Sequence, residues 1–285
     1  MGVVFNDPFI TFEPETHQYF DQFGDEYKSV SRVLNAHAVP FDKDGVSMAM
    51  AKQAASSSGN TIKQEQQKLL GQWKAKADSS IERGNFIHNG LEEFALTGKV
   101  EDPNLKKVSE QLTPILQSGY RYYPEQISFV QDYLVAGQAD LVIQRQKKED
   151  SVIDIYDYKT NESKGIQYDS VRRKDGKVTH YNKFFLPPID HLEDCNYNRY
   201  VLQLSMYACM FQLTYNAKIG KLAILFIDLD HKLHEIPVPY MKYEAIELLK
   251  SNTKLKKLPE HGKELKHDNE RSEAKAGGTV FSEDW

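Results

Sequence analysis

The feature that most constrains the fold is a pair of apolar runs separated by a short polar break. The runs Ile127–Gln144 and Ser151–Tyr158 are rich in β-forming residues. Apolar β-formers that flank a polar break predict a β-hairpin. A turn centred on Lys148-Glu149 would place Asp140 directly opposite Asp157 on the neighbouring strand.

The two facing aspartates predict a site for a divalent cation. Directly opposed residues have Cβ atoms about 4.5–5.5 Å apart, and two carboxylates at that distance do not ionise together easily without a cation. Lys159 follows Asp157 by two residues, so both side chains lie on one face of the strand. The alternative is a pair of surface aspartates at strand ends, which the apolar neighbours Val142 and Ile155 make costly.

Composition narrows the class of protein further. The length of 285 residues allows one large domain or two small ones, and 40% hydrophobic with 27% charged residues is usual for a globular protein in water. Two cysteines, Cys195 and Cys209, are too few for a disulfide framework or an iron–sulfur cluster, so we expect a reducing, intracellular setting. The sequence shows no secretory leader and no apolar run of membrane-spanning length, so we expect no membrane partner.

The order of elements predicts an α/β domain with one central mixed sheet flanked by helices. An N-terminal hairpin at Phe9–Tyr27 is followed by helical segments up to Ala77, and a Ser79-Ser-Ile-Glu82 capping box predicts the start of the next helix. Gly98 marks its end. The expected units are an N-terminal hairpin and helical addition at 1–78, a core at 79–253 and a charged, disordered tail at 254–285.

Beyond the hairpin, the chain predicts a helix, two strands and a final helix. The helix covers Tyr197–Leu213, the strands cover Lys221–Asp228 and Lys232–Val238, and the last helix covers Met241–Asn252. Between the hairpin and these elements, the polar stretch Thr160–His180 predicts a long loop.

Three further groups of residues are candidates for the site. His88 shares a helical face with Gly84 and Glu92, and its alternative interpretation is a hydrogen-bonded histidine at the core boundary. Gln203 and Tyr207 are four residues apart and share a face, although this is also compatible with an ordinary helix surface. The loop after Lys159 contains basic residues that either follow a phosphate backbone or are simply solvated, and these are Arg172, Arg173, Lys174 and Lys177.

Four motifs occur in an order that resembles the PD-(D/E)XK nuclease superfamily. They are Arg83-Gly-Asn-Phe-Ile-His88, Gly137-Gln-Ala-Asp140, Asp157-Tyr-Lys159 and Gln203-Leu-Ser-Met-Tyr207. The pattern is similar to the RecB-like exonuclease branch, to which the mitochondrial genome maintenance exonuclease and phage-type exonucleases belong. The resemblance extends over residues 9–249. It implies a restriction-endonuclease-like core with helical N-terminal additions.

The resemblance implies a role for each candidate residue. Mg²⁺ or Mn²⁺ would be held by His88, Glu125, Asp140, Asp157 and the main-chain carbonyl of Tyr158. Catalysis would use Asp140, Asp157 and Lys159, with Gln203 and Tyr207 touching the phosphate or supporting the lysine.

The implied activity is a metal-dependent DNA exonuclease that hydrolyses phosphodiester bonds from a DNA end in recombination, repair or phage replication. Its partner would be DNA that is single-stranded or has a free end. The enzyme would work in the cytoplasm of a bacterial or phage-infected cell. No motor phosphate loop is visible, so a helicase or single-strand-annealing partner would be a separate protein. The alternatives are an endonuclease of the same fold, of the resolvase or restriction type, and a non-catalytic nucleic-acid-binding protein on a nuclease scaffold.

Overall fold

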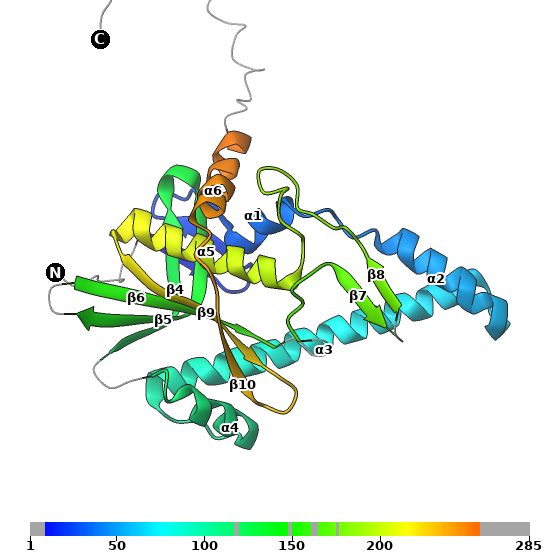
Figure 1. Ribbon diagram of the computed structural model, residues 1–285, viewed down its shortest axis with the longest axis horizontal. Coiled ribbons are helices and arrows are strands. Elements are labelled where there is room, and N and C mark those ends of the chain that lie inside the picture. The colour runs from blue at the N-terminus through cyan, green and yellow to red at the C-terminus, as the bar shows by residue number, and fades with distance from the viewer. Residues whose placement is uncertain (1–8, 117–119, 148–149, 161–164, 175–176, 257–285) are drawn as a thin grey trace, which may run out of the picture.

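The computed structural model describes residues 9–116, 120–147, 150–160, 165–174 and 177–256. This part of the chain is built around a central mixed sheet with helices on both faces (Figure 1). The prediction of an α/β fold with a central mixed sheet flanked by helices is therefore confirmed. None of the described helices combines the length and the apolar character that crossing a bilayer requires.

The central sheet has eight strands among the described residues, ordered β1-β2-β3-β5-β6-β9-β10, with β4 paired to β5 outside this path. Two pairings are parallel, β3 with β5 and β6 with β9, and the others are antiparallel. The strands are β1 (Ile10–Glu13), β2 (Gln18–Asp21), β3 (Glu26–Ser29), β4 (Arg121–Val130), β5 (Val135–Lys147), β6 (Asp150–Lys159), β9 (Lys218–Ile227) and β10 (Leu233–Pro237).

The predicted hairpin exists, and it is one half of a three-stranded antiparallel unit. Leu141 pairs with Tyr156 and Lys147 with Asp150, which is the predicted register; the turn residues 148–149 lie outside the described part. The first apolar run is not one strand. It spans β4 and β5, which are joined by the short 3₁₀ helix η1 (Gln131–Tyr133) and by Leu134 in a left-handed conformation.

The helices are α1 (Val30–Ala36), α2 (Lys43–Ser58), α3 (Ile62–Thr97), α4 (Pro103–Leu112), α5 (Asn196–Tyr215) and α6 (Lys242–Lys256). The helix start predicted at Ser79 is wrong, because α3 begins at Ile62, where Thr61 and Gln64 form the capping box. Gly98 ends the helix in a left-handed conformation, as predicted. The expected boundary between residues 78 and 79 lies in the middle of α3, and β3 joins the N-terminal strands to β5.

Two apolar layers enclose the sheet. On one face, α1, α5 and α6 cover a core that includes Val142, Ile155, Leu204, Phe211 and Leu248. On the other face, α3 and α4 bury a second core, which includes Ile87, Leu91, Val108, Leu141 and Tyr158. Leu141 and Val142 belong to different cores because successive side chains of a strand point to opposite faces.

The segment between β6 and α5 differs from the predicted loop. It contains a two-stranded sheet, β7 (Val171–Lys174) with β8 (Lys177–His180). Residues 161–164 and 175–176 lie outside the described part, as do residues 257–285, which make up most of the predicted tail. The final helix α6 extends to Lys256.

Candidate metal centre

The site lies at the point along β5 where its neighbour in the sheet changes from β3 to β6. One edge of β5 pairs with β3 at Val135 and Ala136 and with β6 from Leu141 onward. Asp140 lies between these two partners, just before the β6 ladder. Tyr158, which lies beyond the last pair of that ladder, donates its backbone N–H to Oδ2 of Asp140 at 2.5 Å. The carboxylate therefore provides a hydrogen-bond acceptor where the sheet no longer does.

Three carboxyl groups lie at one level across β4, β5 and β6. Pro124 pairs with Leu141 and Gln126 with Ala139, so the β4–β5 register places Glu125 opposite Asp140. The β5–β6 register, continued by one position beyond its last pair, places Asp157 on the other side of Asp140. Like charges directly opposite each other destabilise a sheet. Three ionised carboxylates in such a row would therefore destabilise the fold unless a positive group or a bound cation lay beside them.

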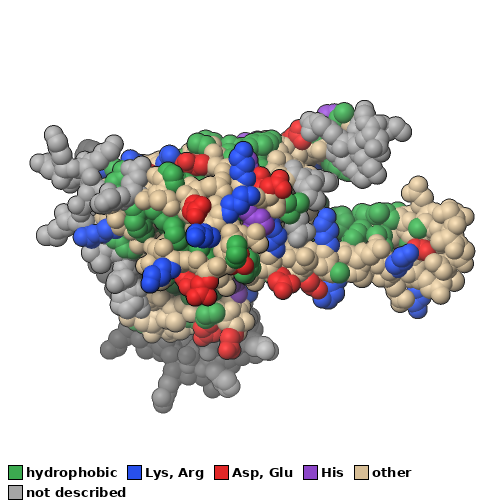
Figure 2. Space-filling model, turned by 90° about the horizontal axis from the view of Figure 1, so that it is seen from below, with side chains coloured by type: hydrophobic (Ala, Val, Ile, Leu, Met, Phe, Trp, Pro, Cys, Tyr) green, Lys and Arg blue, Asp and Glu red, His purple; other side chains and the backbone are tan. Residues whose placement is uncertain are grey.

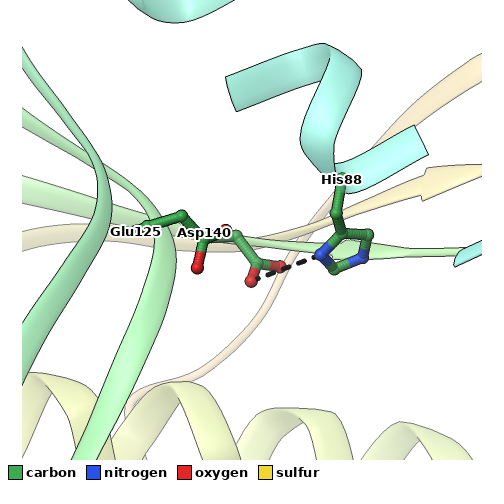
Figure 3. A group of neighbouring side chains, drawn as sticks. All are labelled: His88, Glu125 and Asp140. Atoms are coloured by element: carbon green, nitrogen blue, oxygen red, sulfur yellow. Dashed lines mark ion pairs between the residues drawn. The ribbon is translucent and has the colours of Figure 1, made fainter. Parts of the chain in front are cut away.

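His88 brings an imidazole to this row from α3. Ligand atoms of His88, Glu125 and Asp140 all lie within 4.8 Å of one another (Figure 3). Nδ1 of His88 is 3.6 Å from Oδ1 of Asp140. The three residues come from three elements, α3, β4 and β5, so the group exists only in the folded chain. It has the size and donor set that could hold one cation.

The second nitrogen of His88 determines the orientation of the ring. Nε2 lies 3.1 Å from the carbonyl oxygen of Tyr158. A carbonyl oxygen can only accept, so Nε2 carries the proton and Nδ1 faces Asp140. Metal-binding histidines commonly donate their other N–H to a backbone carbonyl in this way. His88 is thus hydrogen bonded, as its alternative interpretation required, and its second nitrogen also faces the carboxyl groups.

Asp157 and Lys159 form an ion pair beside this group. Nζ of Lys159 contacts Oδ2 of Asp157, and it also lies 5.0 Å from the centre of the Tyr200 ring. Asp157 is 1% exposed, and its Oδ1 has no hydrogen-bond partner among the described residues. A buried carboxylate oxygen without a partner fits a site that receives a cation. The roles of Asp157 and of the Tyr158 carbonyl as metal ligands remain predictions.

The three carboxyl groups of the row have different pKa values because their surroundings differ. Burial and the neighbouring Asp140 raise the pKa of Glu125 to about 8. Burial also raises the pKa of Asp157, to about 6, although Lys159 opposes this. Burial acts on Asp140 in the same direction, but His88 and Lys159 outweigh it and lower the pKa. Without a cation, Asp140 therefore carries the negative charge while Glu125 keeps its proton at neutral pH.

The two basic groups respond to these carboxyl groups. Burial favours the neutral form of His88, but Asp140 outweighs it and raises the pKa of the imidazole. The pKa of Lys159 is raised in the same way. Burial favours the neutral amine, but Asp157 and Asp140 outweigh burial. The two carboxylates therefore affect the pKa of Lys159 more strongly than burial does.

Helix α5 adds the predicted glutamine and tyrosine. Nε2 of Gln203 donates to the hydroxyl oxygen of Tyr207 at 3.1 Å, so the two residues share a face as predicted. The Tyr207 ring packs on Gly137, where a Cβ would lie only 2.7 Å from Cε1 of the ring. Burial and the nearby Asp157 raise the pKa of Tyr207.

Sequence reasoning missed the roles of three residues around the site. Arg83 donates to the carbonyl oxygens of Thr160 at 2.7 Å and Asp228 at 2.8 Å, which fastens α3 to the ends of β6 and β9. Tyr200, whose ring faces Lys159, precedes Gln203 by three residues. Glu92 contributes to the raised pKa of Glu125. Helical spacing could have indicated two of them, because Tyr200 lies three residues before Gln203 and Glu92 lies four residues after His88.

The basic residues predicted to bind nucleic acid lie on β7 and β8. The structure describes the backbone pairing of these strands, but the side chains of Arg172, Arg173, Lys174 and Lys177 lie outside the described part. Their role therefore stays a prediction.

Comparison with known proteins adds little to this picture. No family model matches the chain, and no curated protein matches it. One solved structure, "Crystal structure of SSO0001", is similar at 17% sequence identity, with a TM-score of 0.30, over 80% of this chain and 85% of that chain. At this level of similarity, neither fold nor function is transferred.

Proposed function

We propose that this protein is a metal-dependent DNA exonuclease with a restriction-endonuclease-like core. The observation that supports the proposal most is the row of Glu125, Asp140 and Asp157 across three adjacent strands, flanked by His88 and Lys159. Carboxylates and an imidazole provide a cation site, and an ammonium beside them suits an anionic phosphodiester.

The cation would be Mg²⁺ or Mn²⁺, held by His88, Glu125 and Asp140, with Asp157 adjacent. An imidazole among oxygen ligands fits Mn²⁺ at least as well as Mg²⁺. When bound, such an ion supplies polarisation of the scissile phosphate and a lowered pKa of a water molecule.

The residues of the chain would orient the substrate and offset its charge. Lys159 is held by Asp157 and Tyr200 and keeps its proton, because the neighbouring carboxylates raise its pKa. It is therefore suited to neutralise charge that develops on the phosphate oxygens. Gln203 and Tyr207 provide an amide and a hydroxyl group that could contact the same phosphate.

The test is a digestion of end-labelled single- and double-stranded DNA with Mn²⁺, with a covalently closed circle as control. We expect cleavage that depends on a DNA end. We expect Asp157→Ala and Lys159→Ala each to lower the cleavage rate by about a hundredfold to a thousandfold. Lys232→Ala, which changes an exposed lysine on the β9–β10 turn, should retain the rate.

The result also separates the alternatives. Cleavage of the closed circle would favour an endonuclease. Full activity in both site variants would overturn the assignment of the site. DNA binding without any cleavage, and without heat on titration with either metal ion, would favour a non-catalytic binding protein.

A further inference from the structure

Helix α2 and the first half of α3 form a projecting arm, defined here as residues 41–78. The two helices lie side by side and extend away from the sheet (Figure 1). Figure 2 shows hydrophobic side chains gathered on the arm. Phe41 is 65% exposed, Met50 47% and Ile62 41%. Several large apolar side chains exposed on one projection are typical of an interaction surface.

The most exposed of these side chains is part of an aromatic pair. The rings of Phe41 and Trp73 have centroids 6.0 Å apart and planes inclined by 53°. The pair joins the segment before α2 to the middle of the arm's α3 portion. Because Phe41 is mostly exposed, the pair offers an aromatic surface to solvent. Exposed aromatic faces stack with unpaired nucleobases and tolerate any base.

The arm is also more positive than the rest of the chain. Residues 42–78 contain six lysines and four carboxylates, a net charge of +2, whereas the whole chain has −5, which leaves −7 elsewhere. Three of the four carboxylates are engaged within the arm. Asp42 accepts from the N–H of Gly45, Glu65 accepts from Asn60, and Asp78 pairs with Lys74. A positive arm on a negative protein favours a polyanionic partner.

We propose that the arm binds single-stranded nucleic acid, with bases stacked on Phe41 and Trp73 and phosphates beside the lysines. The inference rests on the proposed function and names its substrate class. A duplex hides its base faces in the stack, so the aromatic pair distinguishes a single strand from a duplex. Trp73 and His88 lie on the same continuous helix, about 22 Å apart along its axis. A strand held on the arm is therefore connected to the metal centre by one rigid element.

The chain contains a built-in reporter for this interaction. It has two tryptophans, Trp73 and Trp285, so in a Trp285→Phe background all tryptophan fluorescence comes from the arm. Oligo(dT) is titrated in EDTA, which prevents cleavage, and a blunt duplex of equal length serves as the comparison. We expect saturable quenching with oligo(dT) and none with the duplex.

Variants of Phe41 test the stacking itself. Phe41→Ala should weaken oligo(dT) binding by about 5- to 150-fold, the range for losing one base–aromatic stack. Phe41→Leu keeps an apolar side chain and should weaken binding as well, with an unchanged melting temperature. Tyr243→Ala is the matched control, because Tyr243 is 72% exposed on α6, and it should bind like the parent.

The outcomes separate this inference from the proposed function. Cleavage by the parent, with unchanged oligo(dT) binding in both Phe41 variants, would overturn the role of the arm and leave the nuclease assignment. Loss of binding in both variants, with no cleavage by the parent, would support the arm and overturn the assignment. A doubling of molecular mass with concentration that Phe41→Ala abolishes, without quenching by oligo(dT), would assign the surface to a second copy of the chain.

Discussion

Glu125 combines a left-handed backbone conformation, with φ of +48°, and a carboxyl group opposite Asp140. A non-glycine residue in this conformation costs about 1–3 kcal/mol. The facing carboxylate adds to the cost and contributes to the pKa of about 8. In the proposed cation site, a bound ion would offset both of these costs.

Replacing Glu125 by glutamine should therefore stabilise the metal-free protein at alkaline pH. Its folded pKa of about 8 lies above the ordinary value of 4.5, so the native state binds the proton more tightly than the unfolded state. This stability is present below about pH 4.5 and is lost as the pH rises to about 8. Glutamine cannot ionise, so we expect Glu125→Gln to melt about 3–6 °C higher at pH 9 in EDTA.

The same substitution should weaken metal binding, which calorimetric titration with Mn²⁺ measures. Glu93→Gln is the matched control on α3, because Glu93 is exposed and outside the metal group. It should change neither the melting temperature nor the affinity. If Glu125→Gln and its parent had the same pH dependence of melting, the raised pKa of Glu125 would be contradicted.

At the scale of elements, the contact between β5 and α5 depends on the absence of a side chain at Gly137. A Cβ there would lie 2.7 Å from Cε1 of Tyr207 and 2.9 Å from Cγ2 of Val30. We expect Gly137→Ala to push α5 from the sheet, to lower the free energy of unfolding by about 1–3 kcal/mol and to reduce cleavage. Urea unfolding measures the first effect and the end-labelled DNA assay the second.

Another glycine, which lies on a helix and not on a strand, provides the control for this prediction. Gly71 lies in α3, and a Cβ added there would have no neighbouring atom within 4 Å, so alanine fits without a clash. Because alanine favours a helix more than glycine does, Gly71→Ala should stabilise the protein by about 0.5–1 kcal/mol. Equal effects of the two substitutions would show that packing against Tyr207 is not limiting.

Sequence patterns predicted the elements whose signals are local. The β5–β6 register followed from the polar break, and the end of α3 followed from Gly98. The pairing of Gln203 with Tyr207 followed from helical spacing. In each case a periodic or capping signal lies within a few residues of the feature that it predicts.

The remaining features depend on contacts between distant segments. Two capping patterns, at Thr61 and at Ser79, precede the same helical sequence, and the structure uses only the first. The position of Glu125 opposite Asp140 depends on the β4–β5 register, which was hidden because one apolar run contained both strands. Contacts of Arg83 with Thr160 and Asp228 join segments 77 and 145 residues apart. No local signal predicts such pairings.

At the scale of the whole molecule, the carboxyl row links the stability of the fold to the protonation of its carboxyl groups. The proposed cation would link both to metal binding. Three strands of the central sheet bring Glu125, Asp140 and Asp157 together, so the native state concentrates carboxyl groups that the unfolded chain keeps apart. A cation that binds only the native state stabilises it by mass action. Protons on Glu125 and His88, whose pKa values are both raised, compete with that cation.

Mn²⁺ should therefore raise the melting temperature, and more so at pH 8.5 than at pH 6.5. At a hundred times the dissociation constant the stabilisation is about 2.7 kcal/mol, which corresponds to about 5–10 °C for a chain of this size. The shift is measured against EDTA by differential scanning calorimetry. Asp140→Asn, which removes the central carboxylate of the row, should reduce the shift to less than about 1 °C. An equal shift in this variant would place the bound ion elsewhere, because the group of ligand residues found in the described part of the chain includes Asp140.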